Sequence, residues 1–189
     1  MNIQARLAPL FCVATLSVGT IAIAGEHEHR HHDSHEHGVA ELNIAIDGKH
    51  VLIELDSPAA NIVGFEHAPQ NPQQQDLVDH AINTLEHPEN FLLFTPSAEC
   101  LLEDSEIETG LTAKQHDHHH DGASDAPASR HSEFNVSYRF SCDKIAKLKY
   151  VDVKLFSRFE GLEDIKVQMI TPNRQGLLEL NPSHTKIEF

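Results

Sequence analysis

Residues 42–55, LNIAIDGKHVLIEL, contain the pattern that decides the fold. Apolar residues occupy every second position over 42–46 and again over 51–55, which is typical of strands with one buried face, although Leu52 adds an apolar residue on the other side. Asp47-Gly48, between the two runs, is a strong signal for a tight turn. The stretch therefore predicts an antiparallel β-hairpin.

Further elements are predicted on either side of this hairpin. Alternation over residues 134–142 predicts the clearest strand of the chain, with Cys142 on its buried face. One amphipathic helix is expected from Pro72, with Asn71 as its N-cap, to a residue before Pro88. Shorter strands are expected at 91–94, 100–102, 150–156, 165–171 and 177–180, an irregular loop at 61–72 and turns at 144–149 and 157–164. Because the connections are short, we expect an α+β fold with a mostly antiparallel sheet of six to eight strands and one clear helix.

Composition excludes one large class of partner. The chain has 189 residues with 29 acidic and 14 basic residues, which gives a formal net charge of −15. Nucleic acid is a polyanion that calls for a basic protein face, so no nucleic-acid partner is expected. The chain also lacks a recognisable nucleophile–base arrangement and a phosphate-binding glycine loop, and we expect no enzymatic activity.

The first 24 residues predict export. A short segment with Arg6 precedes an apolar run that ends in Ala22-Ile23-Ala24. This order is typical of a secretory signal peptide that is cleaved after Ala24, while an uncleaved membrane anchor would need a longer apolar run. We therefore expect a periplasmic protein with no membrane insertion after cleavage, and a single α+β domain over residues 38–189.

Two cysteines, Cys100 and Cys142, remain after this cleavage, because Cys12 lies inside the signal segment. In an oxidising compartment such a pair is expected to form one disulfide. The alternative is a thiolate metal site, which is less favoured because the two cysteines are isolated in the sequence.

Histidine is concentrated in two segments that we call the histidine tracts. Residues 25–37 read GEHEHRHHDSHEH and residues 114–130 read KQHDHHHDGASDAPASR. Neither tract has an apolar pattern that could be buried, so both are expected to be disordered without a ligand. The tracts contain ten of the sixteen histidines: His27, His29, His31, His32, His35, His37, His116, His118, His119 and His120.

Imidazole and carboxylate groups in this density predict binding of divalent transition metals such as zinc, copper or nickel. Further candidate ligands are Asp117, Asp121 and His131 at the second tract, and Glu66 with His67 in a loop framed by glycine and proline. Many ligand combinations are possible, so several ions can bind. Binding should weaken as the pH falls through about 6.5, because protons compete for the imidazole nitrogens.

Three other interpretations stay open at this point. The tracts could be passive linkers of an interaction module, a buffer for copper or nickel in the cell envelope, or part of a zinc-dependent hydrolase. The HExxH match at residues 27–31 does not favour the hydrolase, because that motif needs a helix with one apolar face and this segment has none.

The sequence resembles the ZrgA-type periplasmic zinc-binding proteins over residues 25–189. The resemblance rests on the following motifs: HEHG at 35–38, Ser57-Pro58, GFEHAP at 64–69, Cys100, the histidine-rich insertion, Tyr138-x-Phe140-x-Cys142, Leu155-Phe156 with Phe159 and Gly161, and Asn181-Pro182. It implies a partly β-rich α/β fold and an exported protein that binds zinc and assists uptake by a zinc ABC transporter. The implied partner is the solute-binding component of that transporter. The implied zinc ligands are the histidines of the two tracts, with Glu66 and His67 as additional candidates.

Overall fold

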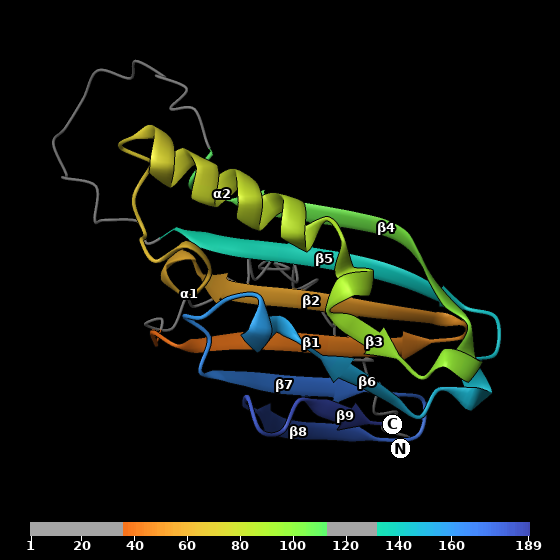
Figure 1. Ribbon diagram of the computed structural model, residues 1–189. Coiled ribbons are helices and arrows are strands. Elements are labelled where there is room, and N and C mark those ends of the chain that lie inside the picture. Colours follow the sequence, from red (N-terminus) through yellow and green to blue (C-terminus); the bar gives the residue numbers. More distant parts are fainter. Residues whose placement is uncertain (1–35, 113–131) are drawn as a thin grey trace, which may run out of the picture. The chain divides into compact units, whose positions relative to one another are not determined.

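The computed structural model describes residues 36–112 and 132–189. Within these residues the chain forms a large sheet, a small sheet and two α-helices, of which one is long (Figure 1). The expected α+β class, with a mostly antiparallel sheet and one clear helix, is confirmed. The main sheet falls within the predicted range of strand number, and the separate small sheet was not predicted.

The strands divide between the two sheets as follows. The main sheet has β1 (Val39–Asp47), β2 (His50–Pro58), β4 (Cys100–Thr109), β5 (Glu133–Cys142), β7 (Asp164–Ile170) and β8 (Gln175–Leu180), in the spatial order β4-β5-β2-β1-β7-β8. The small sheet has β3 (Leu92–Phe94), β6 (Tyr150–Val153) and β9 (Lys186–Glu188), in the order β3-β6-β9. The helices are α1 (Ala59–Val63) and α2 (Pro72–Leu85).

The predicted hairpin is confirmed as β1 and β2. The two strands pair antiparallel, from Glu41 opposite Asp56 to Asp47 opposite His50. At the turn, Gly48 has a φ of 58°, a left-handed conformation that glycine adopts without steric cost. The Asp-Gly signal in the sequence therefore corresponds to the turn that sets the register of the hairpin.

Strand β1 is central because it also pairs with β7. This second pairing is parallel, with Val39 opposite Asp164 and Ala45 opposite Ile170. The other strand pairs among the described residues are antiparallel. The parallel pair brings the start of the domain beside a strand that lies far away in the sequence.

One face of the main sheet, which we call the inner face, is covered by α2 and the small sheet (Figure 1). The hydroxyl of Tyr138 on β5 donates a hydrogen bond to the carbonyl oxygen of Leu85, at the end of α2, over 2.7 Å. Phe94 of the small sheet contacts Phe140 of β5 edge to face, with ring centroids 4.7 Å apart. Burial raises the pKa of Tyr138 well above its usual value. The core therefore lies between the inner face and these covering elements.

Helix α2 has the predicted start and end. The Asn71 side chain accepts a hydrogen bond from the Gln74 backbone N–H over 2.9 Å, as expected of an N-cap. The helix buries Val78, Ala81 and Leu85 on one side and ends before Pro88. The amphipathic pattern in the sequence therefore identified most of the buried stripe of the helix, but Leu77, which the same pattern places on that side, is 49% exposed.

A hydrogen bond to Asp152 joins β6 of the small sheet to the segment before β9, and an ion pair with Lys154 lies beside it. Asp152 accepts a hydrogen bond from the Thr185 hydroxyl over 2.6 Å, and its other carboxylate oxygen lies 2.9 Å from Lys154 Nζ. Partial burial raises the pKa of Asp152, but the hydrogen bonds from Thr185 and Lys154 outweigh it, so the net pKa lies below the usual aspartate value.

Four elements differ from the predictions. Helix α1 occupies residues 59–63, where a loop was predicted from residue 61. Strand β4 continues to Thr109 rather than ending at Leu102. Strand β6 ends at Val153 and is followed by a 3-10 turn, and strand β9 was not predicted.

The predicted disulfide between Cys100 and Cys142 is present. The two residues lie directly opposite each other at the first position of β4 and the last position of β5. The disulfide therefore ties the edge strand to its neighbour at one end of the main sheet. At the other end of the same strand pair, Thr109 lies opposite Phe134, and the chain leaves the sheet toward residues 113–131.

Candidate functional site

The segments that contain the two histidine tracts join the main sheet at the same end. Strand β1 begins there with Val39, beside the end of β2 at Pro58 (Figure 1). Pro58 lies opposite Glu133, the first residue of β5, and the Ala59 N–H donates to the Ser132 carbonyl over 2.8 Å. The antiparallel and parallel registers together therefore place both points of attachment at one end of the sheet.

Helix α1 lies at this end and holds the start of β1 in place. The Asn61 side chain is 3% exposed, and its oxygen accepts a hydrogen bond from the Gly38 N–H over 2.8 Å. Its nitrogen donates to the Val39 carbonyl over 2.9 Å. A Cβ atom at Gly161 would lie 2.6 Å from the Asn61 carbonyl oxygen, so glycine is required for this close approach. Asn61 therefore fixes the backbone directly after the first tract.

The chain turns sharply after α1 and presents Glu66. Gly64 ends the helix with a φ of 86°, and its N–H donates to the Ala60 carbonyl over 3.0 Å. Glu66 Oε1 lies 3.1 Å from His37 Nε2, the last histidine of the first tract. The Glu66 side chain is 17% exposed and the His37 ring 72% exposed. A largely covered carboxylate thus meets an accessible imidazole where the first tract enters the sheet.

His67 is not brought to the same point. Its Nδ1 lies 2.9 Å from the carbonyl oxygen of Ala68, and its ring stacks on Phe65 with centroids 5.1 Å apart. Among residues 36–112 and 132–189, no three His, Cys, Asp or Glu side chains form a group that could hold a metal ion. Both cysteines are in the disulfide, which excludes the thiolate site considered above.

The donor atoms of His37 and Glu66 fit zinc in kind but not in number. Imidazole nitrogen and carboxylate oxygen are both common zinc ligands, and zinc in proteins takes about four ligands. The described part of the chain supplies two of them at this point. The pair can therefore act as part of a zinc site and needs further ligands from elsewhere.

Most of the predicted ligands lie outside the described residues. These are His27, His29, His31, His32, His35, His116, Asp117, His118, His119, His120, Asp121 and His131. Their role stays a prediction. Sequence reasoning missed Asn61, which no motif singled out, and the pairing of His37 with Glu66, which depends on the sheet.

The described helices are all too short or too polar to cross a membrane. A comparison with curated proteins gives no match. A comparison with family models gives one for the zinc uptake proteins of the ZrgA family, over residues 34–189, which is most of the chain. Together with the resemblance in its motifs, this match shows that the chain belongs to the ZrgA family of zinc uptake proteins.

Proposed function

We propose that this chain is a periplasmic zinc-binding accessory protein that captures zinc with its two histidine tracts and passes it to a zinc ABC transporter. One observation carries this proposal: the sheet holds both attachment points at one end, and His37 and Glu66 meet where the first tract joins it. Histidines from two segments that lie far apart in the sequence can therefore reach the same ion. Zinc is the cargo in this account, and the protein needs no catalytic step.

The ordered pair gives zinc binding a starting point. Fixing each tract residue around an ion costs roughly 1–2 kcal/mol in backbone entropy. His37 avoids part of this cost because the next residue, Gly38, is already held by Asn61. A zinc ion that first contacts His37 and Glu66 would then recruit its remaining ligands from the neighbouring tract histidines.

The same architecture favours release. Ligands from long segments can be exchanged one at a time, so a partner that offers its own ligands can take over the ion stepwise. The partner we propose is the solute-binding component of a zinc ABC transporter, which the family resemblance supports. The signal-like first 24 residues support the periplasm as the place where the transfer occurs.

Zinc titration of the exported protein tests the capture step. At about pH 7.5 the wild type should bind several equivalents of zinc, and at about pH 5 most of it should be released, because protons compete for imidazole. Replacing every tract histidine by serine should remove most of the capacity. The matched control replaces His80, His87 and His184, which lie outside the tracts, and should keep the capacity unchanged.

A second pair of variants tests the ordered pair. His37→Ala and Glu66→Gln should each weaken the tightest zinc equivalent without changing the total number by more than one. Full zinc capacity after loss of all tract histidines would contradict the proposal and move binding into the folded domain. Stronger retention of copper or nickel than zinc in a mixed-metal competition would instead favour an envelope metal buffer.

A further inference from the structure

We propose that the face of the main sheet opposite the core, the outer face, is the docking surface for a protein partner with a cationic surface and a protruding apolar side chain. This deepens the proposed function, on which it rests for its biological meaning, because zinc transfer requires a partner held beside the tracts. Three features of the outer face support this role: the sheet register, one exposed leucine and the distribution of charge.

The outer face is uncovered among the described residues. Strand registers place every second side chain on it, and α2 and the small sheet lie on the other side (Figure 1). On β1 and β2, for example, Glu41 and Glu54 are exposed while Leu42 and Leu55 are buried. Six strands side by side span about 24 Å, and seven residues along each strand span about 23 Å. This part of the outer face therefore has an area of roughly 550 Å². This approaches the ~800 Å² that each partner contributes to a stable interface.

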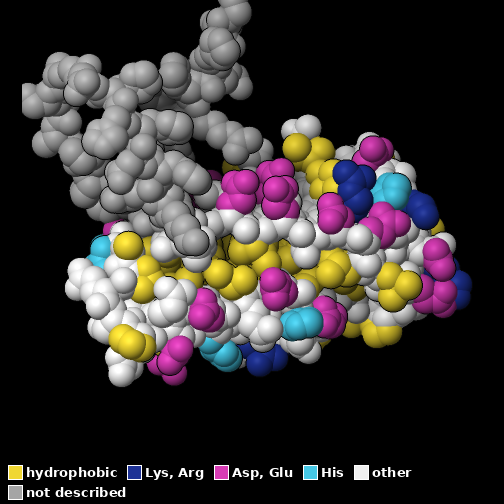
Figure 2. Space-filling model, turned by 90° about the horizontal axis from the view of Figure 1, so that it is seen from above, with side chains coloured by type: hydrophobic (Ala, Val, Ile, Leu, Met, Phe, Trp, Pro, Cys, Tyr) yellow, Lys and Arg dark blue, Asp and Glu magenta, His cyan; other side chains and the backbone are white. Residues whose placement is uncertain are grey.

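Two rows of side chains cross the outer face near the end of the sheet where the histidine tracts join it, and both rows are acidic. The first row consists of Glu108, Asn135, Asp56, Glu41, Lys166 and Glu179, and the second of Glu106, Ser137, Glu54, Asn43, Gln168 and Leu177. The two rows together contain six carboxylates and one ammonium group, so their formal net charge is 1 − 6 = −5. Lys166 Nζ also lies 3.4 Å from Glu36 Oε2, so its charge is partly neutralised already. Figure 2 looks down on β4, the edge strand of the main sheet, and shows acidic side chains along that edge.

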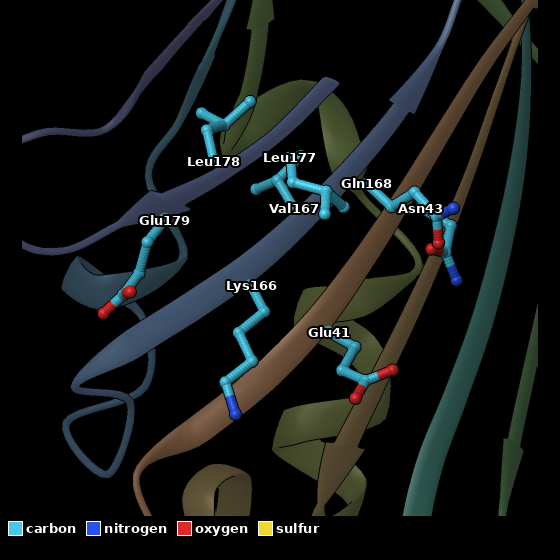
Figure 3. Close-up of a pocket in the computed structure, with 8 residues that line it drawn as sticks. All are labelled: Glu41, Asn43, Lys166, Val167, Gln168, Leu177, Leu178 and Glu179. Atoms are coloured by element: carbon cyan, nitrogen blue, oxygen red, sulfur yellow. The ribbon is translucent and has the colours of Figure 1, made fainter. Parts of the chain in front are cut away.

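A shallow hollow at the β8 side of these rows supplies an apolar contact. It has a volume of about 510 Å³, and Glu41, Lys166, Gln168 and Leu177 contribute to its lining (Figure 3). The Leu177 side chain is 83% exposed. Burying a leucine side chain is worth about 1.5–3 kcal/mol, so an apolar group that enters the hollow would gain a substantial contact. The hollow therefore has room for an anchoring apolar side chain of a partner, and the carboxylates fit basic residues around that anchor.

Charge decides between the possible occupants. A second copy of this chain would place acidic rows against acidic rows across a two-fold interface, which is repulsive. Nucleic acid and anionic lipid are repelled for the same reason. A cationic protein surface is attracted, with an association rate that falls as salt screens the charges.

Site-specific photo-cross-linking in the exported protein tests this docking surface. A photoreactive residue replaces Leu177 in one variant and Leu101 in the control, an outward-facing leucine on the opposite edge strand that is 72% exposed. We expect an adduct with another protein from position 177 but not from position 101. Mass spectrometry should place the contacted peptide in a segment with net positive charge and an apolar residue.

Charge reversal makes the test specific. Glu54→Lys with Glu106→Lys should reduce the adduct by about tenfold or more. Asp76→Lys with Glu86→Lys, which makes the same charge change on and just after α2, should leave it unchanged. The absence of an adduct, an adduct between two copies of this chain, an acidic contacted peptide or equal yields from both positions would each overturn the proposal.

A cell assay separates this proposal from the proposed function. Leu177→Asp should bind as much zinc as the wild type but support growth on chelated zinc no better than a strain without the protein, whereas Leu101→Asp should behave as the wild type. Normal growth with Leu177→Asp would overturn the docking surface. If loss of the whole protein leaves zinc-limited growth unchanged, the proposed function fails, and the cross-linking result still decides whether the outer face docks a partner.

Discussion

Asn61 should be the residue outside the hydrophobic core on which the candidate site depends most. Asn61→Ala removes the acceptor of the Gly38 N–H and the donor to the Val39 carbonyl. Each hydrogen bond contributes about 1 kcal/mol, and a buried backbone group left without a partner costs about 1–3 kcal/mol. We therefore expect the free energy of unfolding to fall by about 2–4 kcal/mol, a large part of the 5–15 kcal/mol typical of a domain.

Urea denaturation of the wild type and the variant measures this loss of unfolding free energy. An unchanged slope of the free energy against urea concentration would show that both proteins expose the same surface on unfolding. Asn83→Ala is the matched control, because Asn83 is exposed on α2, and it should change the free energy of unfolding by less than about 0.5 kcal/mol. Asn61→Asp keeps the acceptor but sets a carboxylate against the Val39 carbonyl, so its destabilisation should ease as acid protonates the new side chain. A loss below about 1 kcal/mol for Asn61→Ala would refute the reasoning.

Three further predictions concern the support of the fold. Tyr138→Phe leaves the Leu85 carbonyl without its donor and should lower the free energy of unfolding by about 1–3 kcal/mol, as measured by urea denaturation. Replacing Cys100 and Cys142 by serine opens a loop with a sequence separation of 42 residues and should cost about 4 kcal/mol; an unchanged melting temperature under non-reducing conditions would contradict a stabilising disulfide. Asp152 has a lowered pKa, so its contribution to stability is present above the ordinary aspartate pKa of about 3.9 and is lost as the pH falls below it. Asp152→Asn should therefore have a lower melting temperature than the wild type at neutral pH. This difference should disappear when thermal denaturation is measured at low pH.

The parts of the fold with local signals could be predicted from the sequence. The Asp47-Gly48 turn and the Asn71-Pro72 helix start each need only a few neighbouring residues, and both lie where they were expected. Helix α1 escaped prediction because five residues are too few for a periodic pattern. The polar half of β4 escaped because an edge strand exposes carboxylates such as Glu106, which protect it against pairing with other chains.

The candidate site was predictable only as separate residues. His37 and Glu66 were each expected as ligands, but 29 positions separate them in the sequence. Their contact requires the hairpin, the turn at Gly64 and the hydrogen bonds of Asn61, and none of these signals specifies the others. His67 had the same support from sequence as Glu66, yet its ring packs on Phe65 instead. Which neighbour a loop side chain meets is decided by tertiary packing.

The insertion between β4 and β5 has a consequence for how this protein can vary. The two strands remain paired up to Thr109 and Phe134, so chain added between Gly110 and Ser132 leaves the ladder intact. The entropy of closing such a connection grows only with the logarithm of its length, and doubling it costs about 0.6 kcal/mol. We therefore expect that the number of histidines in this segment can change, in natural variants or in laboratory designs, with little effect on the stability of the folded part. If the tract binds zinc as proposed, its length would then set how many ions each molecule carries.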